Sequence, residues 1–359
     1  MRETFDPAYR RLAACLDALP NGFPPAEDAA DLRLLAKLFS VEEAELAANL
    51  HAEMETAAQI AQRLGREMRS VAELLKQMAR KGLILFGKTA DGRPGFGLMP
   101  FVVGIYEAQA GRLDEEFAQL FEVYYQQTFV QSLRIQPQVH RVIPVRQSIR
   151  NDMEVRPFES ATEILRAAAA WGVVDCICRT QRALIGQGCS HPVDVCMVLS
   201  SKPGAFDGNA TIRALNYDEA LQTLRRAADA GLVHCVSNQQ EDLWYLCNCC
   251  TCSCSLLRGM AELGIANVVA HSAFVCEADV SLCAGCGACL ERCSFGALAL
   301  EGDCVEVRTI RCVGCGLCVT VCPQDALHLV RRADETDPPK DGAAWGSARA
   351  AARQSEKFD

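Results

Sequence analysis

The chain contains 359 residues, of which 50% are hydrophobic and 23% are charged, so it is long enough for two or three domains with buried cores. Its formal net charge of −9 argues against a protein whose whole surface binds a polyanion. Of its 21 cysteines, all but Cys15 lie between Cys176 and Cys322. Disulfide-rich proteins are usually short secreted chains, and the N-terminal segment does not resemble a secretory signal. We therefore expect a cytoplasmic protein without a membrane span, in which clustered thiols bind metal.

Residues 1–104 have the pattern of a helix–turn–helix followed by a hairpin. Thr56 and Gln59 have the spacing of a capping box that begins a short helix, and a longer amphipathic helix follows. From Leu83 to Phe101, two short apolar runs flank a glycine-rich turn, which predicts a β-hairpin. This order of elements resembles the winged-helix family, so we expect a winged-helix-like domain here.

The longer helix of this domain carries a basic face. Its basic residues are Arg66, Arg69, Lys76 and Arg80. In DNA-binding members of the winged-helix family such a face meets phosphates and base edges, so these residues are candidate DNA contacts. Glu73 in the middle of the face weakens the prediction, and winged helices also serve as protein docking modules.

Residues 105–275 are predicted to contain a linking helix and then a small, cysteine-rich α/β domain. Strand-like and helical segments alternate from about residue 140 onward. The domain includes the sequence CICR, which begins at Cys176, and the sequence CNCC, which begins at Cys247. We expect a further metal site here, with the candidate ligands Cys176, Cys178, Cys189, Cys196, Cys249 and Cys250.

Two kinds of metal centre fit this middle site, an iron–sulfur cluster and a zinc ion. If CICR lies in a strand, Cys176 and Cys178 face the same side, and the CNCC element supplies a remote ligand. Arg179 would offset part of the negative charge of the thiolates. Zinc would fit the same ligands but would be colourless and redox-silent. His191, beside Cys189, is a weaker candidate, because a lone histidine in a loop more often makes hydrogen bonds.

Residues 276–330 carry the strongest metal-binding pattern. The spacing CxxCxxCxxxC occurs at Cys283, Cys286, Cys289 and Cys293, and again at Cys312, Cys315, Cys318 and Cys322. A cubane cluster needs four thiolates from different directions, and two-residue spacers let one loop supply three of them. Zinc ribbons use separated CxxC pairs, so the pattern favours 4Fe-4S clusters.

This segment resembles the bacterial two-cluster ferredoxins, in which the fourth cysteine of each run ligates the other cluster. The resemblance implies two ligand sets: Cys283, Cys286, Cys289 and Cys322 for one cluster, and Cys312, Cys315, Cys318 and Cys293 for the other. Ser294 stands where that family usually has proline. The whole chain also resembles a group of bacterial iron–sulfur proteins that are described only as 4Fe-4S binding.

These features predict a multidomain α+β protein with a winged-helix-like domain, an α/β middle domain, a ferredoxin-like domain and a flexible tail at residues 331–359. The first hypothesis is an electron-transfer protein with two 4Fe-4S clusters and a third cluster, or zinc, that relays electrons to a partner oxidoreductase. The alternative is a DNA-binding, redox-sensing regulator. A third class is an enzyme whose middle cluster binds substrate, but the sequence favours an electron carrier or accessory subunit.

Overall fold

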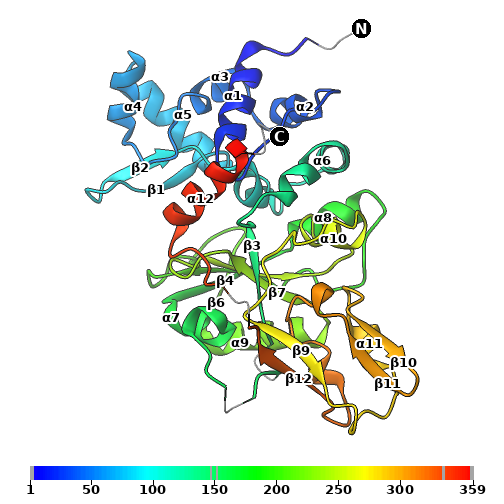
Figure 1. The fold of residues 1–359 in the computed structure, drawn as a ribbon. Helices are drawn as coiled ribbons and strands as arrows, with labels where there is room; N and C mark the ends of the chain where they lie inside the picture. Colours follow the sequence, from blue (N-terminus) through cyan, green and yellow to red (C-terminus); the bar gives the residue numbers. More distant parts are fainter. Residues whose placement is uncertain (1–3, 146–147, 151–152, 334–335, 356–359) are drawn as a thin grey trace. The chain divides into compact units, whose positions relative to one another are not determined.

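The computed structural model of the chain describes residues 4–145, 148–150, 153–333 and 336–355. It contains both helices and strands, consistent with the predicted α+β class, and it divides into two compact units (Figure 1). The first unit comprises Met1–Ser132 with Arg353–Asp359, and the second comprises Leu133–Ala352. Among the described residues, no helix combines the length and the apolar character needed to cross a membrane.

The first unit is mainly helical. Its α-helices are Pro7–Ala18 (α1), Ala30–Leu38 (α2), Val41–Ala47 (α3), Ala57–Leu64 (α4), Met68–Arg80 (α5) and Glu115–Gln127 (α6). The predicted capping box is present at α4: the N–H of Gln59 donates to Thr56 Oγ1 at 3.3 Å, and the N–H of Thr56 donates to Gln59 Oε1 at 2.8 Å. Gly65 ends α4 in the left-handed region with φ 62°, as glycine does at many helix ends.

A hairpin follows α5 in this unit. Its strands are β1 (Leu85–Lys88) and β2 (Pro94–Gly97), which pair antiparallel with Leu85 opposite Gly97. The predicted helix, helix and hairpin are therefore present, and the assignment to the winged-helix family stays a prediction.

The boundary of the first unit lies beyond the predicted limit at residue 104 because an aromatic core holds α6. Tyr124 of α6 lies 4.9 Å from Phe23, between ring centroids. Phe121 of the same helix stacks on Tyr106 at 3.9 Å. The helix expected to begin the middle domain therefore belongs to the core of the N-terminal unit.

The second unit is built on a six-stranded sheet with the strand order β3-β7-β8-β5-β4-β6, in which all neighbours are antiparallel. The strands are His140–Ile143 (β3), Ala170–Val174 (β4), Cys196–Ser200 (β5), Arg213–Leu215 (β6), Val233–Ser237 (β7) and Tyr245–Cys249 (β8). Helices α7 (Ala161–Ala167) and α9 (Tyr217–Asp229) contribute Leu165 and Leu224 to the buried core of this sheet.

The structure corrects the prediction that CICR lies in a strand. Strand β4 ends at Val174, and Cys176 is the residue that precedes helix α8 (Ile177–Leu184). The charged Asp175 interrupts the apolar run and is exposed where the chain leaves the sheet. The CNCC element also leaves its strand after Cys249, and turns lead from it to α10 (Leu257–Ala261).

The C-terminal part of this unit contains two small antiparallel sheets. Strand β9 (Phe274–Ala278) pairs with β12 (Leu327–Arg331), and β10 (Leu298–Glu301) pairs with β11 (Cys304–Val307) (Figure 1). The first cysteine-rich loop leads into α11 (Ala288–Arg292), and the second leads into a short 3-10 helix, η7 (Val319–Val321). Further 3-10 or π turns lie at Phe101–Ile105 (η1), Glu107–Gln109 (η2), Phe129–Arg134 (η3), Pro157–Glu159 (η5) and Thr309–Arg311 (η6).

The tail differs from its prediction because it contains helix α12 (Gly342–Ser355). Arg349 of this helix is only 1% exposed, and its guanidinium donates to the carbonyls of Ile135 and, at 2.8 Å, Pro137. The indole N–H of Trp345 donates to Gln138 O at 2.9 Å. Polar side chains anchor the helix, so a search for apolar periodicity does not find it. Residues 334–335 and 356–359 of the predicted tail lie outside the described residues.

Candidate metal centres

The first cysteine-rich loop and one distant cysteine line a common hollow. Cys283 and Cys286 lie in the loop after β9, and Cys289 lies in α11. Cys322, which directly follows η7, lines the same hollow. The structure thus brings together the four residues that the ferredoxin resemblance assigns to one cluster.

The second loop is similarly completed by a cysteine from the first run. Burial and the neighbouring thiols of Cys318, Cys312 and Cys293 raise the pKa of Cys315. Cys293 directly follows α11, so it approaches the second loop from the opposite half of the segment. Cys293 packs against the buried cluster of side chains that contains Cys312 and Cys318, as the second predicted ligand set requires.

The chemistry of these donors fits iron–sulfur clusters. Burial, followed by the nearby Cys318 and Cys322 thiols, raises the pKa of Cys289 to about 11, so crowded thiolates here need a compensating cation. Backbone N–H groups also point at sulfur: Ala297 donates to Cys293 Sγ and Ala326 donates to Cys322 Sγ, both at 3.3 Å. Such donors stabilise bound thiolates and influence the potential of a cluster.

The middle of the chain contains a further group, which we name the six-thiol ring. Contacts between side chains connect its members in a closed circle, in the order Cys176, Cys178, Cys254, Cys249, Cys247 and Cys196. Four of them are predicted ligands, whereas Cys247 and Cys254 are not. Their approach depends on α8, β5 and the turn after β8 meeting at one place.

Cys235 and His140 adjoin the ring at Cys249. Cys235 lies on β7 and His140 on β3, and their ligand atoms lie within 4.8 Å of each other and of Cys249 Sγ. Hydrogen bonds from Cys235, Cys247 and Cys254 lower the pKa of Cys249. These neighbours thus favour the thiolate form of Cys249, which is the form that binds metals.

A buried arginine lies among these thiols. Arg179 of α8 is 2% exposed and donates to Asn248 O at 3.1 Å and to Cys250 Sγ at 3.6 Å. Burial opposes the charge of Arg179, but the adjacent Cys176 and Cys196 thiolates raise its pKa above the usual value. A buried cation is costly unless it is paired with negative charge, so Arg179 would stabilise metal-bound thiolates beside it.

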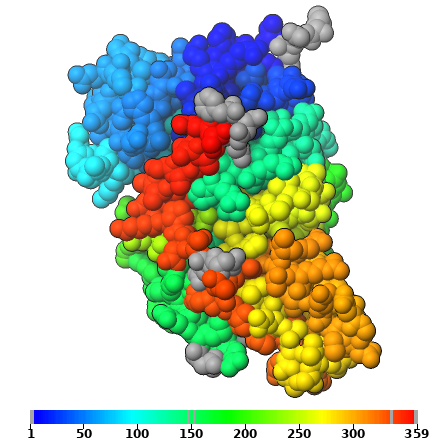
Figure 2. Space-filling view, in the orientation of Figure 1, coloured from blue at the N-terminus to red at the C-terminus, as the bar shows by residue number. Residues whose placement is uncertain are grey.

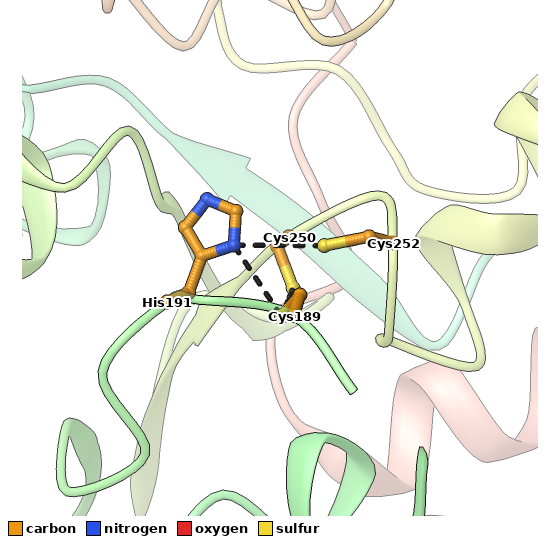
Figure 3. Close-up of side chains that lie close together, drawn as sticks. All are labelled: Cys189, His191, Cys250 and Cys252. Carbon is orange, nitrogen blue, oxygen red and sulfur yellow. Dashed lines mark hydrogen bonds between the residues drawn. The ribbon is translucent and has the colours of Figure 1, made fainter. Parts of the chain in front are cut away.

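The two remaining predicted ligands, Cys189 and Cys250, lie in a second group together with His191 and Cys252 (Figure 3). Hydrogen bonds from Ser253 and His191 outweigh the effect of burial and lower the pKa of Cys189 to about 6. Sequence analysis missed Cys252 as a ligand and gave His191 little weight. The available signal was a pair of short repeats, Cys189-x-His191 and Cys250-x-Cys252.

The candidate DNA contacts lie on or next to α5 of the first unit. Arg66 precedes the helix and forms an ion pair with Glu42 at 2.8 Å. Arg69, Lys76 and Arg80 are exposed on the helix itself.

Part of the chain matches a known protein family. Residues 304–328 match the 4Fe-4S binding domain family, and this segment contains Cys312, Cys315, Cys318 and Cys322. The match supports an iron–sulfur, ferredoxin-like domain in this part of the chain with at least one 4Fe-4S cluster. No curated protein and no solved structure matches the chain.

Proposed function

We propose that the protein transfers electrons through two 4Fe-4S clusters in its C-terminal segment. The observation that carries the proposal is the crossing of ligands, in which Cys322 lines the hollow of the first loop and Cys293 adjoins Cys315 of the second. Clusters with four cysteine ligands have no open iron position, which suits one-electron transfer better than substrate chemistry.

The six-thiol ring would hold a third cluster. Its six thiols follow one another in a closed circle, so the group is larger than the four ligands of a single ion. Together with the adjoining Cys235, it offers more thiols than the four that a cubane requires, so the ligands need not be neighbours in the ring. Arg179 would balance part of the negative charge of such a cluster.

The ring lies beside the second loop, which supports a continuous path for electrons. Hydrogen bonding to Cys249 and burial raise the pKa of Cys235, and the nearby Cys315 of the second loop raises it further. The N–H of Val145, which follows β3, donates to Cys315 O at 2.9 Å and fixes this loop against the sheet unit. The three centres would therefore follow one another in space, with the second cluster in the middle.

The surface around the first loop suits a protein partner. Cys286 is exposed, which brings the first cluster close to solvent. Large apolar side chains are exposed in the same segment at Val280 (63%), Leu282 (49%) and Leu300 (42%), and at Ile310 (86%) before the second loop. The exposed carboxylates of residues 276–330 are Glu277, Asp279, Glu291, Glu301, Asp303, Glu306 and Asp325. Strands β10 and β11, in orange in Figure 2, form part of this surface. We propose an oxidoreductase partner with a basic rim around an apolar patch.

The test is anaerobic purification and reconstitution, followed by iron analysis and by EPR spectroscopy after dithionite reduction. We expect about eight iron atoms from the C-terminal segment and about twelve if the ring holds a third cubane. The variant Cys15→Ser is a control, because Cys15 lies in the first unit, outside both cysteine runs. A fully reconstituted protein without reducible cluster signals would contradict electron transfer.

DNA binding is a second candidate because three basic side chains of α5 are exposed in a helix–turn–helix–hairpin arrangement. A gel-shift titration at low salt with the triple variant Arg69→Ala, Lys76→Ala, Arg80→Ala separates the two functions. DNA binding predicts a shift that weakens steeply with added salt and is lost in the triple variant. Absence of a shift for the unaltered protein would exclude this candidate.

A further inference from the structure

We propose that the chain holds a mononuclear zinc ion at a site separate from its iron–sulfur centres. The four ligands are Cys189, His191, Cys250 and Cys252 (Figure 3). This site does not depend on electron transfer, and it divides the sequence-predicted middle site into two centres of different chemistry.

The distances between the ligand atoms are those of a single tetrahedral ion. Zinc bonds of about 2.3 Å to sulfur and about 2.0 Å to nitrogen place two sulfur ligands roughly 3.8 Å apart, and sulfur and nitrogen roughly 3.5 Å apart. Cys189 Sγ lies 4.0 Å from Cys250 Sγ. His191 Nδ1 lies 3.4 Å from Cys189 Sγ and 3.5 Å from Cys252 Sγ. All four ligand atoms lie within 4.8 Å of one another.

The same geometry argues against a cubane at this position. A cubane carries each thiolate on a different iron atom, so its sulfur ligands lie farther apart, at roughly 6 Å. Three sulfurs and one imidazole nitrogen are one of the common ligand sets of structural zinc sites. A closed set of four ligands leaves no position for substrate, so the ion would have a structural role.

Two short loops build the site. Cys189 and His191 lie in the loop between α8 and β5, and alternate positions place both side chains toward the ion. Cys250 directly follows β8, and Cys252 lies in the turn beyond it. Each pair has one intervening residue, so each loop supplies two ligands from a single tight turn.

The surroundings compensate for the charge of the site. Three thiolates, a neutral imidazole and Zn²⁺ have a net charge of about −1. The guanidinium of Arg179 donates to Cys250 Sγ at 3.6 Å and supplies a positive charge. Ser253 Oγ lies 3.3 Å from Cys189 Sγ. Hydrogen bonds of this kind orient and stabilise metal-bound thiolates.

The position of the ion indicates its structural role. It would fasten the loop that leads to Cys196 to the turn that leads to Cys254. Both of these cysteines belong to the six-thiol ring. The zinc ion would therefore hold two segments that supply ligands to the ring.

The experiment measures zinc and iron in the anaerobically purified full chain, together with zinc-edge X-ray absorption. We expect about one zinc per chain with three sulfur ligands and one nitrogen ligand. The variant His191→Cys should keep the zinc and change its ligands to four sulfurs, whereas Cys252→Ser should lose most of the zinc. Cys15→Ser is the control, because Cys15 lies in the first unit, outside both proposed centres.

Several results would overturn the proposal. They are purified protein with reducible clusters but no zinc, zinc with unaltered ligands in His191→Cys, and iron as the metal bound by these four residues. If Cys252→Ser does not fold, the change of ligands in His191→Cys still decides the question. EPR of the reduced clusters on the same samples reports electron transfer independently, so the failure of one proposal is distinguishable from the failure of the other.

Discussion

Two glycines at the cluster loops have the same backbone conformation but different surroundings, which allows a quantitative prediction. Gly314 in the second loop has φ +71°, and Gly287 in the first loop has φ +74°. Alanine at either position adopts a left-handed conformation that costs about 1–2 kcal/mol. At Gly287 the new Cβ would find only Leu300 Cδ1, at 3.9 Å. Gly287→Ala therefore carries the conformational cost with almost no steric one.

At Gly314 the new Cβ would lie 2.9 Å from the carbonyl carbon of Phe274 and would overlap its oxygen. Carbon atoms prefer separations of about 3.5–4.0 Å, so the contact with the carbonyl carbon alone requires the loop and β9 to move apart by about 0.6 Å. The overlap with the carbonyl oxygen and with Ser272 Oγ requires a larger movement. The N–H of Ser272 donates to Val313 O at 3.0 Å, and Ser272 Oγ donates to Gly314 O at 2.7 Å. This movement would strain the hydrogen bonds that dock the loop.

Overpacking of this kind typically costs about 1–3 kcal/mol. We therefore expect Gly314→Ala to lower the free energy of unfolding by about 2–5 kcal/mol, against about 1–2 kcal/mol for Gly287→Ala. The assay is anaerobic urea unfolding followed by visible cluster absorption, with the iron content of each variant. Equal unfolding midpoints and equal iron contents for the two variants would refute the steric reasoning.

Three further predictions use the same preparations. Cys293→Ala should damage the cluster of Cys312, Cys315 and Cys318 rather than that of its own run, and selective loss of the other cluster in EPR spectra would contradict the crossed ligation. Arg179→Gln should destabilise the metal-loaded protein by about 3 kcal/mol in thermal unfolding, because it leaves buried thiolates uncompensated. The control Arg225→Gln, at an exposed position, should have almost no effect. Arg349→Ala should lower stability by about 1–3 kcal/mol by leaving buried carbonyls unpaired, with unchanged cluster absorption, whereas exposed Ser347→Ala should be neutral.

The parts of the fold that sequence analysis predicts well depend on neighbouring residues. The capping box joins Thr56 to Gln59, which are only three positions apart in the sequence. The two cysteine runs are also local signals, because the spacing of their cysteines alone indicates a cluster-binding loop. Helix α12 is the counterexample, because its anchor Arg349 bonds to carbonyls more than 200 positions away in sequence.

The middle centres were predicted only in part because their geometry is not local. The candidate set of Cys176, Cys178, Cys189, Cys196, Cys249 and Cys250 contains members of both groups that the structure separates. The division depends on where β8 ends: Cys249 is its last residue, and Cys250 begins the following turn. The adjacent residues Cys249 and Cys250 therefore belong to different centres, and the spacing of the cysteines does not show where the strand ends.

The proposed crossing of ligands between the two C-terminal loops has a consequence for biosynthesis. Cys283, Cys286 and Cys289 leave the ribosome early in the segment, but the hollow that they line is completed by Cys322. The ribosome adds about 5–20 residues per second, so these three thiols lack their fourth partner for several seconds during synthesis. A carrier that delivers a preformed cluster therefore meets a complete acceptor only after translation has passed Cys322. Loading of both clusters would then be a late and mutually dependent event in the maturation of the chain.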